Sequence, residues 1–323
     1  WRRTSYSGLI RAADVPSVSS EPEVVALDDE TGDIPAAVPA AEVGADVVSP
    51  MSELPSGAAF GSLVHAVLET ADPMASDLAG EIEAKVRDHA VWWPVDVSPG
   101  DLAAALVPMH DTPLGPLANG LTLRQIALTD RLRELDFEIP LAGGDFDPGR
   151  GAALADVGRL LDKFLGPDDP LKPYADRLRS AGVDARPLRG YLSGSIDAVL
   201  RIRSGGTRYL VVDYKTNRLG DRDRELTAAD YGQPQLTAAM LHSDYPLQAL
   251  LYVVVLHRFL RWRQPEYDPA RHLGGVLYLF VRGMCGAATP AIDGRPCGVF
   301  GWQPPVELVQ ALSDLLAAGE RAA

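Results

Sequence analysis

Gly-Ser-Ile-Asp at residues 194–197 and Asp-Tyr-Lys at residues 213–215 are the two stretches that decide how this sequence folds. Each lies in an apolar segment that is typical of a strand, and Ser-Gly-Gly-Thr at residues 204–207 is typical of a turn. Strand side chains alternate between the two faces, so Asp213 and Lys215 share a face. The sequence therefore predicts a β-hairpin with strands over 190–203 and 207–216.

The carboxylates of Asp197 and Asp213 meet only if this hairpin has a suitable register. With a two-residue turn at Gly205-Gly206, residue 198 would face residue 213, and Asp197 would point away from Asp213. Convergence requires a loop with an odd number of residues or one β-bulge, and bulges concentrate next to active sites. We therefore expect an odd-length or irregular connection.

Two carboxylates and a lysine at one end of a hairpin suit a divalent-metal site. Mg²⁺ prefers oxygen ligands and keeps several waters, one of which becomes a nucleophile as its pKa falls. An ammonium stabilises the charge that develops on an attacked phosphate, and lysine is rare here, with four among thirty Lys plus Arg. These residues predict metal-assisted phosphodiester hydrolysis. The simpler alternative is that Asp197 and Asp213 cap turns or pair with Lys215 and nearby arginines.

The chain has 323 residues, of which 46% are hydrophobic and 23% charged, as expected for a folded protein with a buried core. Its formal net charge of −14 argues, at face value, against a nucleic-acid partner. However, residues 12–50 hold nine acidic and no basic side chains, whereas residues 189–224 hold eight basic and four acidic ones. A locally positive channel beside the hairpin can therefore still follow a phosphate backbone.

Composition divides the chain into an N-terminal segment with an acidic flexible linker (residues 1–50) and a folded domain with a helical N-terminal part (residues 51–323). Because residue 1 is Trp, we expect the chain to be part of a longer protein. It has no run of eighteen apolar residues and no signal-peptide pattern, which predicts a cytoplasmic protein without a membrane partner. Cys285 and Cys297 are expected to be free thiols, and two cysteines cannot build an iron–sulfur cluster unaided.

The remaining periodicity predicts helices on both sides of a sheet. Apolar residues at helical spacing indicate helices over about residues 57–70, 156–179, 226–242 and 245–263. Residues 134–141 alternate charged and apolar side chains, as a half-exposed strand does, and residues 275–281 form an apolar strand buried on both faces. A strand, a helix and a buried strand in succession make a crossover unit. We therefore expect an α/β fold with a central mixed β-sheet flanked by helices.

Three further side chains join the hairpin as candidates. Gln248 and Tyr252 are four residues apart in the helix predicted over 245–263, so they offer an amide and a phenol on one face. His65 lies off the centre of the apolar stripe of the helix over 57–70, from which it can reach a metal or a phosphate. Two of them also have a simpler interpretation, His65 as a hydrogen-bonded helix histidine and Gln248 as a buried polar contact.

Together these motifs resemble a known family. The chain is similar, through nearly its whole length, to the C-terminal nuclease domains of RecB, the helicase–nuclease subunit of RecBCD, in the PD-(D/E)XK nuclease superfamily. A lone Asp-x-Lys is common by chance, but its combination with Gly-x-Ile-Asp, Gln-x-x-x-Tyr and the Gly-x-x-x-His segment that ends at His65 is specific. The resemblance implies the restriction-endonuclease-like PD-(D/E)XK fold. The absence of a four-cysteine clasp favours RecB over the AddB-like branch.

The resemblance also implies a role for each candidate residue. Asp197 and Asp213 would bind the metal, together with His65 and the backbone carbonyl of Tyr214, and Lys215 would be the catalytic lysine. Glu134 best matches the upstream acidic ligand, since it precedes an aromatic residue by three positions, although Asp136 lies on the same strand face. Gln248 and Tyr252 would position DNA or the attacking water. Arg218 is a candidate phosphate contact, although arginines in such runs are usually solvated.

The sequence thus predicts a Mg²⁺-dependent deoxyribonuclease, acting as an exonuclease or endonuclease in double-strand-break processing and recombinational repair. Mn²⁺ is expected to substitute for Mg²⁺, and we expect no iron–sulfur cluster and, without a phosphate-binding loop, no nucleotide in this part of the chain. The implied partners are DNA single strands delivered by a helicase, the rest of a RecB chain, RecC- and RecD-like subunits, and a recombinase of RecA type. The alternative is a catalytically silent nuclease-fold module that guides DNA or docks a protein in a helicase complex.

Overall fold

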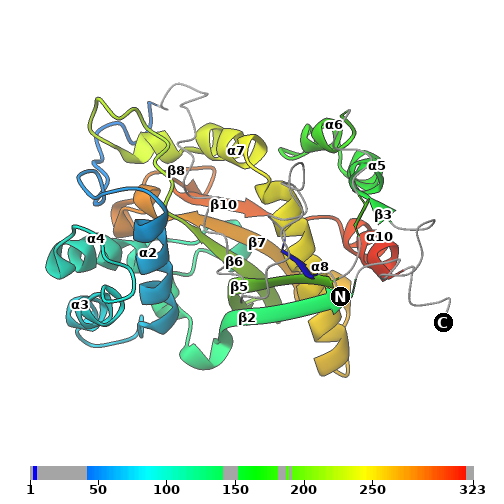
Figure 1. The fold of residues 1–323 in the computed structure, drawn as a ribbon, viewed down its shortest axis with the longest axis horizontal. Helices are drawn as coiled ribbons and strands as arrows, with labels where there is room; N and C mark the ends of the chain where they lie inside the picture. Colours follow the sequence, from blue (N-terminus) through cyan, green and yellow to red (C-terminus); the bar gives the residue numbers. More distant parts are fainter. Residues whose placement is uncertain (1–2, 6–41, 141–151, 181–186, 189–190, 318–323) are drawn as a thin grey trace.

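A computed structural model describes residues 3–5, 42–140, 152–180, 187–188 and 191–317. Within these residues, six strands form one mixed sheet at the centre of the protein (Figure 1). They are β1 (Arg3–Ser5), β2 (Arg131–Pro140), β5 (Tyr191–Ile202), β6 (Arg208–Lys215), β7 (Leu273–Phe280) and β10 (Val299–Trp302). The sheet order is β1-β5-β6-β7-β10, and β2 also pairs with β5. Two small two-stranded antiparallel sheets accompany it, β3 (Ala152–Ala153) with β4 (Pro187–Leu188) and β8 (Ala291–Ile292) with β9 (Arg295–Pro296).

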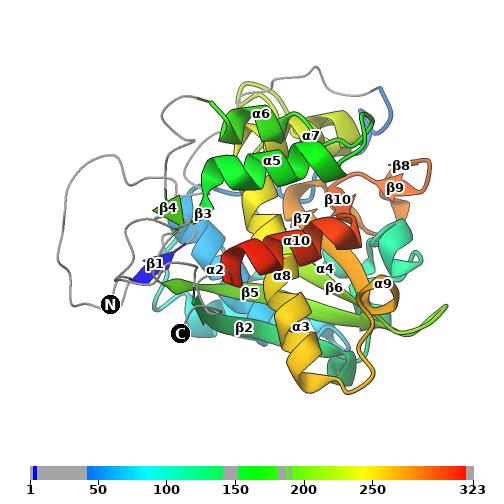
Figure 2. The same cartoon turned by 90° about the vertical axis from the view of Figure 1, so that its right-hand side faces the viewer.

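Helices cover both faces of the sheet, as Figures 1 and 2 show. One face packs against α2 (Ala58–Thr70), α3 (Leu78–His89) and α4 (Pro99–Asp111). The other packs against α5 (Leu154–Phe164), α6 (Tyr174–Leu178), α7 (Gln233–His242), α8 (Tyr245–Arg263) and α10 (Val306–Ala317). The short α9 (Pro269–His272) precedes β7, and 3-10 helices occupy Pro116–Ala118, Leu123–Gln125, Leu128–Asp130, Ala228–Tyr231, Val281–Gly283 and Gly286–Ala288.

Side-chain alternation along the strands creates a separate apolar core on each face. In β6, Leu210 and Val212 enter the core formed with α2, α3 and α4, whereas Val211 enters the core formed with α8. Each fully buried aliphatic side chain contributes about 1.5–3 kcal/mol to folding. All eight residues of β7 are buried, which confirms the strand predicted to be buried on both faces. The α/β fold with a central mixed sheet flanked by helices is confirmed.

The hairpin of β5 and β6 has the odd-length connection that convergence requires. Ile202 pairs with Arg208, which leaves the five residues 203–207 in the loop, and the antiparallel ladder ends at the pair of Ala198 with Val212. Continued by one residue, this register would bring Asp197 opposite Asp213, but the ladder ends before that pair. The condition set by the sequence is therefore met by loop length.

The chain crosses from β6 through α7 and α8 to the parallel neighbour β7, as predicted. The helix predicted over 156–179 is wrong: α5 ends at Phe164 and only α6 follows, because Gly166, Pro170 and Pro173 interrupt the helical pattern. The helix predicted over 226–242 begins instead at Gln233, after a 3-10 turn, with Pro234 in its first turn.

Among the described residues no single helix is long and apolar enough to span a membrane, and α7 and α8 pass that test only as a pair bent by 87°.

Parts of the N-terminal segment pair with the folded domain. β1 lies parallel to β5, with Arg3 opposite Tyr191. Within the range assigned to the linker, the Ser49 amide donates to the carbonyl of Leu226 at 2.8 Å, and Val48 forms a bridge with Thr227. Residues 6–41, most of the predicted acidic linker, lie outside the described residues.

The fully buried guanidinium of Arg282 joins this N-terminal segment to the end of β6. Its Nε donates to the carbonyl of Thr216 at 2.7 Å, its Nη1 to the carbonyl of Met51 at 2.8 Å, and its Nη2 to the carbonyl of Pro55. The guanidinium also lies 5.0 Å from the centroid of the Phe60 ring in α2. Arg282 therefore fixes α2 against the strand that carries Asp213 and Lys215.

We predict that Arg282→Met lowers the free energy of unfolding by about 3 kcal/mol or more, because it leaves several buried carbonyls without a donor. Chemical denaturation of the chain measures this. The control is Arg271→Met, at an exposed arginine of α9, which should change stability by less than about 0.5 kcal/mol. Equal losses in the two variants would show that Arg282 does not hold the segments together.

Candidate active site

The site lies where β5 and β6 separate. The antiparallel ladder between them ends at Ala198, and β1 pairs with β5 only at residues 191–193, so residues 194–197 of β5 border a gap in the sheet. At this gap the backbone amide of Tyr214 donates to Oδ2 of Asp197 at 2.7 Å. A side chain thus replaces the neighbouring strand as the acceptor, and this replacement fixes the carboxylate of Asp197 beside β6.

Asp213 and Lys215 form an ion pair on the α8 face of the sheet. Lys215 Nζ lies 2.7 Å from Asp213 Oδ2, and the two side chains are 6% and 4% exposed. Burial raises the pKa of Asp213 to about 7, against the opposing effect of Lys215 and with a smaller contribution from the charge of Asp197. The pair is therefore a nearly dry charge pair at the end of a central strand.

Asp197 is more accessible and more acidic than Asp213. Nδ1 of His65, on α2, lies 3.4 Å from Asp197 Oδ2, and the two side chains are 23% and 22% exposed. Burial acts to raise the pKa of Asp197, but His65, the Tyr214 amide and Lys215 outweigh it and hold that pKa below its usual range. The two carboxyl groups thus differ in both accessibility and acidity, although both come from one hairpin.

Glu134 lies opposite Asp197 on β2, at an irregularity that affects both strands. The β2–β5 pairing skips these two residues, and Glu134 has a left-handed φ of 46°. Ile196 and Val199, three residues apart, consequently enter the same core, which a regular strand does not allow. The irregularity changes the direction of both strands at Glu134 and Asp197, the two positions that carry candidate carboxylates.

Glu69 was not identified from the sequence, and the structure places it beside Glu134. A hydrogen bond to Glu69, then burial, then the charges of Glu69, Asp136 and Asp197 raise the pKa of Glu134 to about 7. Glu69 follows His65 by four residues in α2, so both lie on one helix face. That spacing is the signal in the sequence that points to Glu69.

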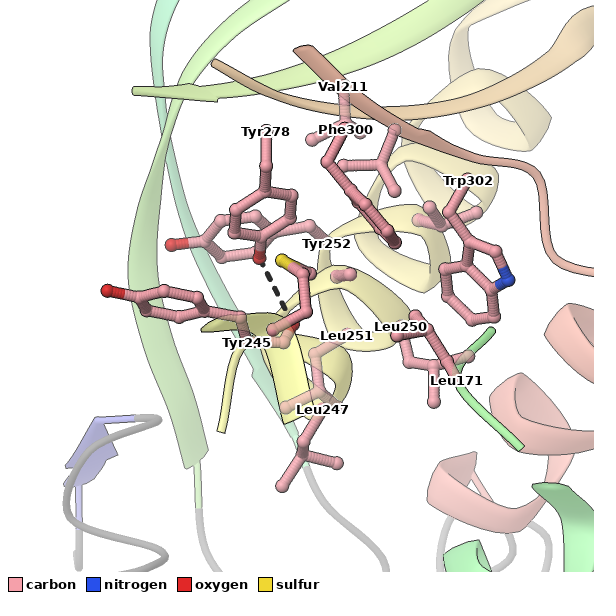
Figure 3. Packing of buried hydrophobic residues seen from close by; sticks show 14 of the residues in the cluster. Leu171, Val211, Tyr245, Leu247, Leu250, Leu251, Tyr252, Tyr278, Phe300 and Trp302 are labelled. Atoms are coloured by element: carbon pink, nitrogen blue, oxygen red, sulfur yellow. Dashed lines mark hydrogen bonds between the residues drawn. The ribbon is translucent and has the colours of Figure 1, made fainter. Parts of the chain in front are cut away.

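Gln248 and Tyr252 lie behind the ion pair, at the N-terminal half of α8, where Figure 3 shows Tyr252 beside Tyr245 and Tyr278. Both are buried, at 8% and 7% exposure. Gln248 Nε2 donates to the Tyr252 hydroxyl at 3.2 Å, and the Tyr278 hydroxyl donates to Gln248 Oε1 at 2.7 Å. Burial, followed by the charges of Asp213 and Asp197, raises the pKa of Tyr252.

Arg218 lies three residues beyond Lys215 and holds loops together. It donates to the backbone carbonyls of Ser52, Asp221 and Arg224 and lines a cavity of about 400 Å³ between residues 52–56 and 218–225. Two other basic residues of this region, Arg201 and Arg203, pair with Asp130 at 2.6 and 2.8 Å. The guanidinium of Arg218 therefore has structural contacts at the rim, and its contact with substrate stays a prediction.

The donor groups at the gap fit a divalent cation by their chemistry. In the described residues no three His, Cys, Asp or Glu side chains are grouped so that they could hold a metal ion as they stand. However, Asp213 Oδ2 is buried, and the contact that the described residues give it is the ion pair with Lys215 at 2.7 Å. A hard cation prefers such carboxylate oxygens. Asp197 and Asp213 are the first candidates to hold one, with His65, Glu134 and the Tyr214 carbonyl as further donors.

Comparison with known proteins identifies the family of this chain. Residues 41–293 match the PD-(D/E)XK nuclease superfamily. The chain belongs to this superfamily. It is 65% identical over 320 residues to RecBCD enzyme subunit RecB of Mycolicibacterium smegmatis, and 66% identical over 325 residues to that of Mycobacterium tuberculosis H37Rv.

These alignments cover 98% and 99% of the chain but 29% of each relative, so the chain spans less than a third of the RecB proteins that it matches. RecB of Escherichia coli K12 is 30% identical over 320 residues, which cover 98% of the chain and 23% of that protein. The resemblance to RecB nuclease domains predicted from the PD-(D/E)XK motifs is confirmed. The individual roles of the site residues stay predictions.

The left-handed backbone conformation of Glu134 predicts steric strain at this position, which substitutions can test separately from any role of its carboxyl group. We predict that Glu134→Gly is more stable than Glu134→Ala by about 1 kcal/mol, because glycine adopts a positive φ without steric cost. Urea denaturation measures the difference. The same two substitutions at Glu138, an exposed position of the same strand, should give the opposite order, since glycine weakens a regular strand. The same order at both positions would contradict the strain at Glu134.

Proposed function

We propose that this chain is a Mg²⁺-dependent deoxyribonuclease of RecB type that hydrolyses DNA phosphodiester bonds during double-strand-break processing. The observation that carries the proposal is the buried ion pair of Asp213 and Lys215 beside the accessible pair of Asp197 and His65. A structural domain gains little from a nearly dry charge pair, since burying two charges costs about as much as their attraction returns. A site that handles phosphate uses both the carboxylates and the ammonium.

Each residue has a defined task in this proposal. Asp197 and Asp213, with His65, Glu134 and the Tyr214 carbonyl as additional ligands, would hold Mg²⁺ or, in its place, Mn²⁺. When bound, the cation supplies positive charge beside the phosphate and lowers the pKa of a water. Lys215 donates from its fixed position to a phosphate oxygen and offsets the negative charge that develops there. Because its environment is nearly dry, that ammonium acts with little screening.

The substrate and partners are proposed from the names of the relatives. RecB is a subunit of the RecBCD enzyme, so we infer that this domain works within a longer RecB chain and beside RecC- and RecD-like subunits. Its substrate would be DNA, as single strands delivered by a helicase, and a recombinase of RecA type is a further proposed partner. We infer exonuclease and endonuclease action from the same relationship.

We predict that Lys215→Ala lowers the rate of DNA cleavage by at least about 100-fold, because it removes a preorganised donor. The assay uses end-labelled linear and circular single-stranded DNA with Mg²⁺ or with EDTA, on this chain and on a reconstituted RecB-type complex. Lys215→Arg should fail as well, since a planar guanidinium does not fit the place of a compact ammonium. Lys163→Ala, at an exposed lysine of α5, is the matched control and should cleave normally. Wild-type rates in Lys215→Ala would remove the lysine from the reaction.

The alternative is a catalytically silent module, and the observation that favours it is that no three ligand side chains are already grouped among the described residues. Metal binding distinguishes this alternative from the nuclease. We predict that Mg²⁺ or Mn²⁺ raises the melting temperature of the wild type, because an ion that binds only the folded state stabilises it by mass action. Asp197→Ala and Asp213→Ala should each abolish this rise, whereas Asp162→Ala, at an exposed residue of α5, should retain it. A rise that survives both site substitutions would place the metal elsewhere.

A further inference from the structure

The ammonium of Lys215 is held by two aromatic rings as well as by Asp213. Lys215 Nζ lies 4.3 Å from the centroid of the Tyr245 ring and 5.6 Å from that of Tyr278. Tyr245 is the first residue of α8, and Tyr278 lies on β7, one strand away from Lys215. Both tyrosines are fully buried. The lysine therefore has a carboxylate and two ring faces around a head group that would otherwise be hydrated.

The two rings are themselves fixed by hydrogen bonds. The Tyr245 hydroxyl donates to Asn217 Oδ1 at 3.2 Å, and the Tyr278 hydroxyl lies 2.7 Å from Gln248 Oε1 and 3.1 Å from the carbonyl of Tyr245. The ring centroids are 5.5 Å apart, and Figure 3 shows the two rings side by side with the bond between Tyr278 and Tyr245 drawn. Gln248, whose amide donates to Tyr252, thus holds Tyr278 from the other side.

We propose that Tyr245 and Tyr278 are positioning residues that hold the Lys215 ammonium in place, and that Gln248 acts on the reaction by fixing Tyr278. The catalytic consequence rests on the proposed nuclease function, whereas the arrangement of the rings does not. A lysine head group has four rotatable bonds behind it and a strong preference for water. Cation–π attraction is strongest where the cation is desolvated, as Lys215 is. The rings thus limit the ammonium to the position where Asp213 also contacts it.

This role differs from the one that the Gln-x-x-x-Tyr pattern implied for Gln248. The pattern placed an amide beside the substrate, whereas both ends of the buried Gln248 amide are occupied by tyrosine hydroxyls. An amide that contacts DNA contributes to substrate binding. An amide that holds Tyr278 contributes to the orientation of Lys215, and so to the chemical step. The two roles predict different kinetic effects.

Side-chain NMR tests the ring contacts without reference to activity. The chain has four lysines, at positions 85, 163, 172 and 215, so protein labelled with ¹³C at lysine Cε gives four signals. We expect one signal displaced to high field by ring currents, absent in Lys215→Arg. It should move towards the other three in Tyr245→Leu and partly so in Gln248→Met. Tyr267→Leu, at a tyrosine that bonds to His257 near the other end of α8, should leave it in place.

The contact is refuted if Lys215→Arg removes no displaced signal, or if that signal stays in place in Tyr245→Leu. Should Tyr245→Leu fail to fold, Tyr278→Phe and Gln248→Met decide, because they nearly keep the volume of the buried side chains. Both remove the hydrogen bond between Tyr278 and Gln248. Tyr278→Phe also removes the contact with the Tyr245 carbonyl, and Gln248→Met removes the bond to Tyr252. An unmoved signal in both of these variants refutes the role of Gln248.

Kinetics test the catalytic consequence. We expect Tyr245→Leu and Gln248→Met to lower kcat by about ten-fold or more with KM for DNA unchanged, since misplacing a reacting group by about 1 Å can cost up to 100-fold. A raised KM with unchanged kcat in Gln248→Met would assign Gln248 to DNA binding and overturn its positioning role. Absence of cleavage by the wild type would refute the proposed function alone, because the NMR result stands without it.

Discussion

The hydrogen bond from the Tyr214 amide to the Asp197 carboxylate is the interaction on which the site depends. A central strand must satisfy its backbone groups, and β6 loses β5 as a neighbour after Val212. By accepting from Tyr214, Asp197 lets the two strands diverge without leaving a buried donor unpaired. The gap that results admits carboxylates from both strands, and the continuing pairing of β6 with β7 keeps Lys215 in a regular strand.

The same arrangement explains why two aspartates from one hairpin differ. Asp197 has His65 and a backbone amide on its accessible side, so its pKa falls, whereas burial dominates at Asp213 and raises its pKa to about 7. Placing the carboxylates of Asp197 and Asp213 close together opposes folding, because like charges repel each other. Packing around the sheet offsets this free-energy cost. Two apolar cores enclose the sheet, and Arg282 ties the end of β6 to the segment before α2.

Sequence reasoning succeeded where the determining pattern is local. The strands β5 and β6, the 19-residue α8 and the buried β7 follow from composition and turn signals within each segment. It failed where a local pattern is ambiguous: helical spacing over 156–179 concealed the break at Gly166 and Pro173. It also missed Arg282 and the two tyrosines around Lys215, because their partners come from distant segments and no spacing along the chain encodes such contacts. The register of the β5–β6 hairpin could be predicted only conditionally, because it depends on whether the loop has an odd or an even number of residues.

The two faces of the sheet contribute unequally to the site. The accessible groups are His65, on α2, and Asp197, at the gap between β5 and β6: each side chain is exposed by more than a fifth. The α8 face contributes the nearly dry pair of Asp213 and Lys215 together with the rings of Tyr245 and Tyr278. An ammonium held from behind by rings and a carboxylate has its position set before any substrate arrives. Little reorganisation is then needed when charge develops in front of it, which is the condition under which electrostatic stabilisation is most effective.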